Sequence, residues 1–203
     1  MLSYYWFGKG DKSAVYLLVL FAATLLFELL MKWINKVSGF KFLYDIFSAT
    51  EYTLFCMYYW SAKGVNKIRH WVKLSVILFV IVSLGCAWLV FHNEIQNRPF
   101  ITRNIEIEST LLIIVYAHLL FIIDDDIPLP IYQHPDFWVG VGVLIFNSGV
   151  FVILVFYPMI LTISKTQATQ SYAYFLGPLN LIQYVCINIR FICLHHNKRL
   201  LIQ

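Results

Sequence analysis

Long apolar runs and short polar connections alternate along the whole chain. A helix that crosses a bilayer needs about 20 mostly apolar residues, and six runs come close to or exceed this length. They cover residues 13–30, 42–62, 74–91, 108–123, 137–163 and 172–194. The connections between them are too short to bury a core of their own. The pattern therefore predicts an all-α transmembrane bundle of about six helices, with residues 1–203 forming a single domain.

The composition agrees with a membrane protein. Hydrophobic residues make up 60% of the chain and charged residues 13%, against about 25% charged residues in an ordinary soluble domain. The net charge of +4 comes from Lys and Arg residues near the ends of the predicted spans, where such residues set topology. We therefore expect the lipid bilayer as a partner and no nucleic acid.

The basic residues also indicate an orientation. Cytoplasmic loops of membrane proteins are enriched in Lys and Arg, and the densest basic segment here is Lys63–Lys73. With six spans, both termini lie on the same side as this segment. We predict cytoplasmic termini and a multi-pass protein of the cell inner membrane.

Small residues on the fifth predicted span indicate close helix packing. Gly142 and Gly149 are seven residues apart and therefore lie on one face of a helix. Small side chains let helix backbones approach each other in lipid. The partner helix belongs either to the same chain or to a second copy in a homo-oligomer.

Acidic residues inside the spans are the strongest candidates for function. Glu28 and Lys32 lie four residues apart on the first span, Asp45 and Glu51 lie on the second, and Glu108 begins the fourth. Charged groups inside a membrane are costly and tend to face the helix bundle. With cytoplasmic termini, all four acids fall in the outer half of the membrane. We predict a polar pocket or ligand-binding site there, formed by Glu28, Asp45, Glu51, Glu108 and Lys32.

A structural interpretation of the same residues stays open. Glu28 can pair with Lys32 along its own helix, and Asp45 can cap the start of the second helix. Glu108 can lie with Glu106 in the headgroup region.

The last two spans carry a second set of polar residues. Asn180, Gln183 and Arg190 follow helical spacing on the sixth span, and Asn147 lies in the middle of the fifth. Amide side chains can hydrogen-bond between membrane helices, so Asn147 is a natural partner for Asn180 or Gln183. We expect Arg190 to extend towards lipid headgroups. Helix packing is favoured here over a transport path.

The sixth span also contains cysteines followed by histidines. Cys186 and Cys193 are seven residues apart, and His195 and His196 come next. Zinc ligands that are close in sequence usually lie in loops reached by water, and a cysteine within a span usually acts as a small hydrophobic residue. We expect no metal and no cofactor.

Parts of the chain resemble a loose family. The stretch Glu28–Lys63, the segment Ile107–Glu108–Ser109 and the segments Pro135–Gly140 and Asn147–Ser148–Gly149 are similar to small polytopic membrane proteins of Bacteroidetes-type bacteria, most of them uncharacterised. Similar bundles also occur as membrane input modules of signalling kinases. The resemblance implies a bacterial inner membrane and a sensory or accessory role. Since no output domain follows Gln203, any signal would need a partner protein.

Four functions remain open at this stage. We favour a sensory or accessory subunit that acts through a protein partner or a homo-oligomer, and not an enzyme. The alternatives are a channel or transporter for protons, ions or a small molecule, a membrane effector of bacterial defence, and an intramembrane lipid enzyme. A transporter would need a continuous polar path, and an enzyme would need a paired acid and base or a metal.

Overall fold

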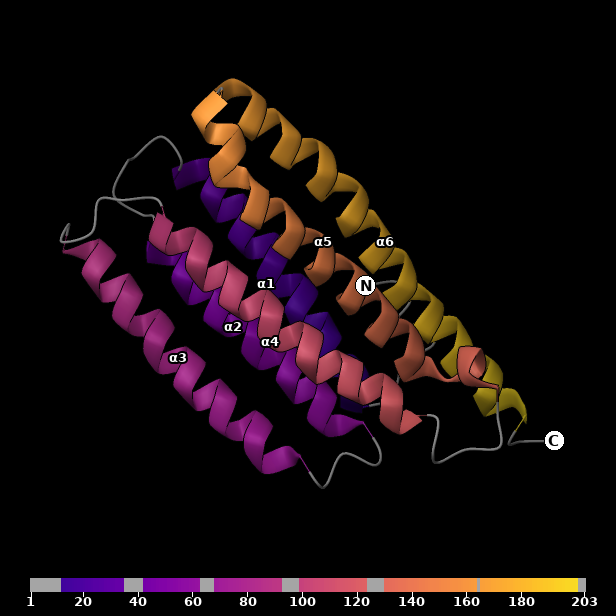
Figure 1. The fold of residues 1–203 in the computed structure, drawn as a ribbon. Coiled ribbons are helices and arrows are strands. Elements are labelled where there is room, and N and C mark those ends of the chain that lie inside the picture. Colours follow the sequence, from indigo (N-terminus) through magenta and orange to yellow (C-terminus); the bar gives the residue numbers. More distant parts are fainter. Residues whose placement is uncertain are drawn as a thin grey trace. The chain divides into compact units, whose positions relative to one another are not determined.

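The computed structural model describes residues 12–34, 42–62, 68–92, 99–123, 130–163 and 165–200, and nearly all of them are helical (Figure 1). The predicted all-α fold with six long helices is confirmed for this part of the chain. The elements in order are α1 (Lys12–Ile34), α2 (Phe42–Ser61), α3 (Arg69–Phe91), α4 (Pro99–Ile123), the 3-10 turn η3 (Ile131–Gln133), α5 (Pro135–Ile163) and α6 (Lys165–Leu200).

Most of these helices are longer than the apolar runs that predict them. Hydropathy marks the part of a helix that suits a membrane, whereas the helix itself continues through polar residues at its ends. Helix α6 therefore begins at Lys165 and not near residue 172. Pro178 lies inside α6, beyond its first two turns. Pro158 likewise lies inside α5, which continues to Ile163.

Five of the six helices are long and apolar enough to cross a membrane. The five candidate spans are Ser13–Trp33, Arg69–Leu89, Arg103–Ile123, Pro135–Thr162 and Tyr174–His196. Helix α2 is 20 residues long but carries Asp45, Glu51 and several hydroxyl groups, which lower its mean hydropathy. The chain is thus a multi-pass membrane protein by the length and composition of its helices. A membrane position for α2 stays a prediction, and so does the cytoplasmic side for the termini, which lie outside the described residues.

The chain divides into two compact units, which are described separately. The N-terminal unit covers Asp11–Glu108 and contains α1, α2, α3 and the first part of α4. In it α2 packs against both α1 and α3. Its buried side chains include Tyr52, Phe55 and Tyr59, which recur at helical spacing and form one face. Helix α2 is therefore the central helix of this unit.

The C-terminal unit contains the rest of α4, η3, α5 and α6, and α5 packs along α6. A Cβ atom added to Gly142 would lie 2.8 Å from the Cβ of Cys186, and one added to Gly149 would lie 2.5 Å from the Cδ1 of Leu179. Both glycines therefore allow a close approach of α6. The predicted helix contact at Gly142 and Gly149 is confirmed, and its partner is a helix of the same chain.

Candidate functional site

A cluster of buried polar side chains lies between α2 and α4 in the N-terminal unit. Asp45 and Ser48 are three residues apart on α2, and Asn104 and Glu108 are four residues apart on α4. These spacings place each pair on one face of its helix. All four side chains are buried, with Asp45 1% exposed and Glu108 5% exposed. We call Asp45, Ser48, Asn104 and Glu108 the acidic cluster.

Two cross-helix hydrogen bonds hold the acidic cluster together. The amide Nδ2 of Asn104 donates to Asp45 Oδ1 at 3.0 Å. One turn further along both helices, the hydroxyl of Ser48 donates to Glu108 Oε2. Ser83 on α3 donates to Asn104 Oδ1 at 3.3 Å and so joins a third helix to the cluster. The arrangement links α2, α3 and α4 by polar contacts.

Each acid of the cluster has one oxygen with no hydrogen-bond partner among the described residues. These atoms are Asp45 Oδ2 and Glu108 Oε1, and both are inaccessible to solvent. A buried polar atom that lacks a partner costs free energy, and the cost is larger for a charged group. A proton, a cation or a polar ligand bound at either oxygen would lower this cost.

Further polar groups lie next to the cluster on the same face of α2. The half-buried Glu51 is close enough for its charge to act on Glu108. Tyr52, one turn beyond Ser48, is within 2.8 Å of the Ser75 hydroxyl on α3, and Ser75 in turn donates to the carbonyl oxygen of Val72. Polar groups thus continue along α2 for two turns beyond Asp45.

The structure brings together three of the four acids predicted to share a pocket. Asp45 and Glu108 belong to the acidic cluster, and Glu51 adjoins it. Glu28 and Lys32 are exposed on α1, so the structure does not bring them into the cluster. Their pairing along the helix stays a prediction. Glu108 faces the interior of the unit, because it is buried whereas Glu106 is only half-buried.

Sequence reasoning missed Asn104 and the contribution of α3. Asn104 carries no charge and lies before the apolar run that defined the fourth span. Its position four residues before Glu108 was the available signal, because that spacing puts both side chains on one helix face.

The polar residues predicted to pack the last two helices differ in burial and in contacts. Asn147 is buried but donates to the Val143 carbonyl oxygen of its own helix at 2.9 Å, so this contact is not the predicted one to α6. Gln183 is buried and Asn180 half-buried on α6. The backbone oxygen of Gln183 lies 3.4 Å from the Cβ position of Gly142. Gln183 therefore lies in the α5–α6 contact, as a packing role requires.

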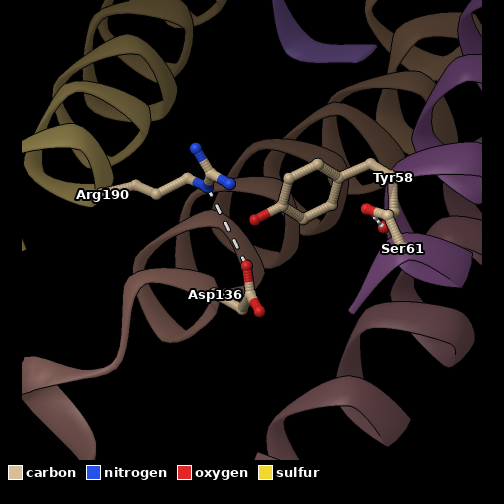
Figure 2. Close-up of polar contacts among 4 residues, drawn as sticks. All are labelled: Tyr58, Ser61, Asp136 and Arg190. Atoms are coloured by element: carbon tan, nitrogen blue, oxygen red, sulfur yellow. Dashed lines mark hydrogen bonds and ion pairs between the residues drawn. The ribbon is translucent and has the colours of Figure 1, made fainter. Parts of the chain in front are cut away.

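Arg190 is part of an ion pair between α6 and α5 (Figure 2). Its Nε lies 3.8 Å from Asp136 Oδ1, and its guanidinium lies 5.3 Å from the ring centre of Phe191. The side chain is 1% exposed. It does not extend to the surface as the sequence suggested, because Asp136 in the first turn of α5 provides a counter-charge within the unit.

The cysteines of α6 lie in different surroundings. Cys186 is buried beside Gly142, and the thiol of Cys193 lies 3.8 Å from the carbonyl oxygen of Tyr132. Within the described ranges, no group of three or more His, Cys, Asp or Glu residues is placed to hold a metal ion. The acidic cluster is therefore the strongest candidate site.

Comparison with protein-family models, with curated proteins and with solved structures found no match. The resemblance to small polytopic membrane proteins stays a prediction. The acidic cluster is therefore the basis for a proposed function.

Proposed function

We propose that this chain is an integral membrane sensory or accessory subunit that responds at the acidic cluster and acts through a partner protein. The observation that carries the proposal is the pair of buried carboxyl groups, Asp45 and Glu108, each with an oxygen that has no hydrogen-bond partner in the described part of the chain. Intramembrane ionisable groups are rare and mark functional sites more often than packing sites. Because the two acids lie on different helices, a bound ligand would change the contact between α2 and α4.

The predicted topology supports access from outside the cell. With cytoplasmic termini, the start of α2, the end of α3 and the start of α4 all lie on the outer side. Glu108 is five residues beyond the start of the candidate span at Arg103, which corresponds to about 7.5 Å along a helix. The cluster would then lie in the outer half of the membrane, within reach of a small external ligand.

The test is a comparison of partner binding by two matched variants. Glu108→Gln retains an oxygen for Ser48 but cannot carry a negative charge, and Glu28→Gln makes the same chemical change at an exposed site. Both proteins are purified from native membranes after mild solubilisation and after cross-linking. We expect a stoichiometric partner with wild type and Glu28→Gln, and an altered amount of that partner with Glu108→Gln. Equal partner binding by all three, or no stoichiometric partner at all, would contradict the proposal.

A channel or transporter for protons or ions is the second candidate. One observation favours it: polar side chains continue from Asp45 past Ser48 to Tyr52, which contacts Ser75 on the neighbouring helix. Such a row is the beginning of a polar path. Purified protein in liposomes distinguishes the two functions, because a transporter would produce ion-coupled flux without any partner and Glu108→Gln would abolish it.

A further inference from the structure

Glu108 is surrounded by groups that leave a negative charge uncompensated. Its Oε2 accepts a hydrogen bond from Ser48, while the buried Oε1 has no hydrogen-bond partner among the described residues. The half-buried Glu51 is close enough for its charge to act on Glu108. A negative charge on Glu51 makes ionisation of the buried Glu108 still more costly, because like charges repel. A proton or another cation must therefore accompany the pair.

Among the described residues, the ionisable groups that interact with the acidic cluster provide no positive charge. From α2 these groups are Asp45, Glu51, Tyr52 and Cys56, and the charge of Glu108 acts on Tyr52 and on Cys56. On α3, Cys86 is affected by the charge of Asp45. Helix α2 contains no Lys, Arg or His.

The basic residues of α4 itself point elsewhere or lie too far away. Arg103 is exposed, and five residues of helix separate it by about 140° around the axis from Glu108. His118 lies ten residues further on, about 15 Å along the axis. Neither is in position to neutralise the Glu51–Glu108 pair.

We propose that Glu108 binds a proton at Oε1 and that this proton is the ligand to which the acidic cluster responds. The inference rests on the proposed function, since it names the ligand of that site. Binding converts the carboxylate into a neutral carboxylic acid, and the proton comes from water on the outer side of the membrane. Release leaves two negative charges on Glu51 and Glu108, and their repulsion acts between α2 and α4. Ser48 keeps its hydrogen bond to Oε2 in both states and acts as a positioning residue.

Infrared difference spectroscopy of the full chain in lipid nanodiscs tests this proposal, because the C=O stretch of a carboxylic acid is absent from a carboxylate. Spectra are recorded over a pH series for wild type, Glu108→Gln, Glu51→Gln and the exposed control Glu28→Gln. We expect wild type and Glu28→Gln to share a carboxylic acid band that disappears as the pH rises. The band should be missing from Glu108→Gln. In Glu51→Gln it should disappear about one pH unit lower, since the neighbouring negative charge that favours the proton is gone.

Two results would overturn the proposal. One is a band that is unchanged in Glu108→Gln, which would assign the proton elsewhere. The other is the absence of a carboxylic acid band from wild type at every pH. If the spectrum then changed with added sodium, potassium or magnesium, the site would be assigned to a metal cation. If Glu108→Gln does not fold, Glu51→Gln still decides, because it leaves Glu108 intact and an unchanged titration would contradict the proposed role of Glu51.

This experiment separates the inference from the proposed function because it needs neither a partner nor an activity. A carboxylic acid band at Glu108 without any partner would refute the sensory role and leave the proton site intact. Partner binding that depends on Glu108 without such a band would refute the proton site alone.

Discussion

Gly142 offers a direct measure of how closely α5 and α6 must pack. In Gly142→Ala the new Cβ would lie 2.8 Å from the Cβ of Cys186 and 3.4 Å from the backbone oxygen of Gln183. Neither neighbour is the end of a flexible side chain, so the helices must move apart. Overpacking of this kind costs about 1–3 kcal/mol. The same change also adds a better helix former, which contributes about 0.8–1.0 kcal/mol in the opposite direction.

A matched variant removes the helix-propensity contribution. Gly85 lies inside α3, and a Cβ atom added there would meet nothing within 4 Å. The difference between Gly142→Ala and Gly85→Ala therefore reports the packing cost at Gly142. For a chain of this size, 1 kcal/mol corresponds to roughly 2–4 °C in Tm, so a packing cost of about 1–3 kcal/mol predicts a Tm about 2–12 °C lower for Gly142→Ala than for Gly85→Ala.

Thermal melting in detergent or nanodiscs, followed by helical circular dichroism, provides the assay. Gly85→Ala should melt at or above the wild-type temperature, and Gly142→Ala should melt below Gly85→Ala. Equal melting temperatures for the two variants would refute the argument, since they would mean that the α5–α6 contact can take an extra methyl group at no cost.

Two further predictions concern the C-terminal unit and the topology. Asp136→Asn removes the charge that faces the buried Arg190 at nearly constant size, and leaving a buried group unsatisfied costs about 1–3 kcal/mol. We expect a lower Tm in nanodiscs and recovery in Asp136→Glu; an unchanged Tm in Asp136→Asn would show that the charge is not needed. Asn66→Cys places a thiol in the basic connection Lys63–Lys73, which we predict to be cytoplasmic. An impermeant thiol reagent should label this cysteine only after the cells are opened. Labelling in intact cells would contradict the predicted topology.

The helices themselves were predictable because membrane-length apolar runs separated by polar connections leave little choice of fold. The helix ends were not, since residues such as those at the start of α6 are polar but still helical. Gly142 and Gly149 were predictable because their spacing alone places them on one face, and small residues on one face predict a close helix contact.

The orientation of each helix about its own axis was harder to predict, and this explains Glu28. Helix α1 is apolar on nearly all sides, so its sequence does not indicate which face meets the rest of the unit. Glu28 and Lys32 fall on the exposed face, whereas the polar side of α2 meets α4. Asn104 was not predicted for a different reason. It is a neutral amide outside an apolar run, so neither charge nor hydropathy indicates its hydrogen bond to Asp45.

The central claim is that Ser48 and Glu108 meet inside one buried polar cluster, and a double-mutant cycle tests it most directly. Ser48→Ala and Glu108→Ala, each of which removes the contact, are made singly and together, and the free energy of unfolding is measured for each in the same lipid environment. Residues in contact show interaction energies of about 0.5–3 kcal/mol, whereas distant pairs add within about 0.3–0.5 kcal/mol. We expect clear non-additivity for Ser48→Ala with Glu108→Ala and additivity for Ser48→Ala with the exposed control Glu28→Ala. Additive effects in both cycles would contradict the claim that Ser48 and Glu108 are in contact.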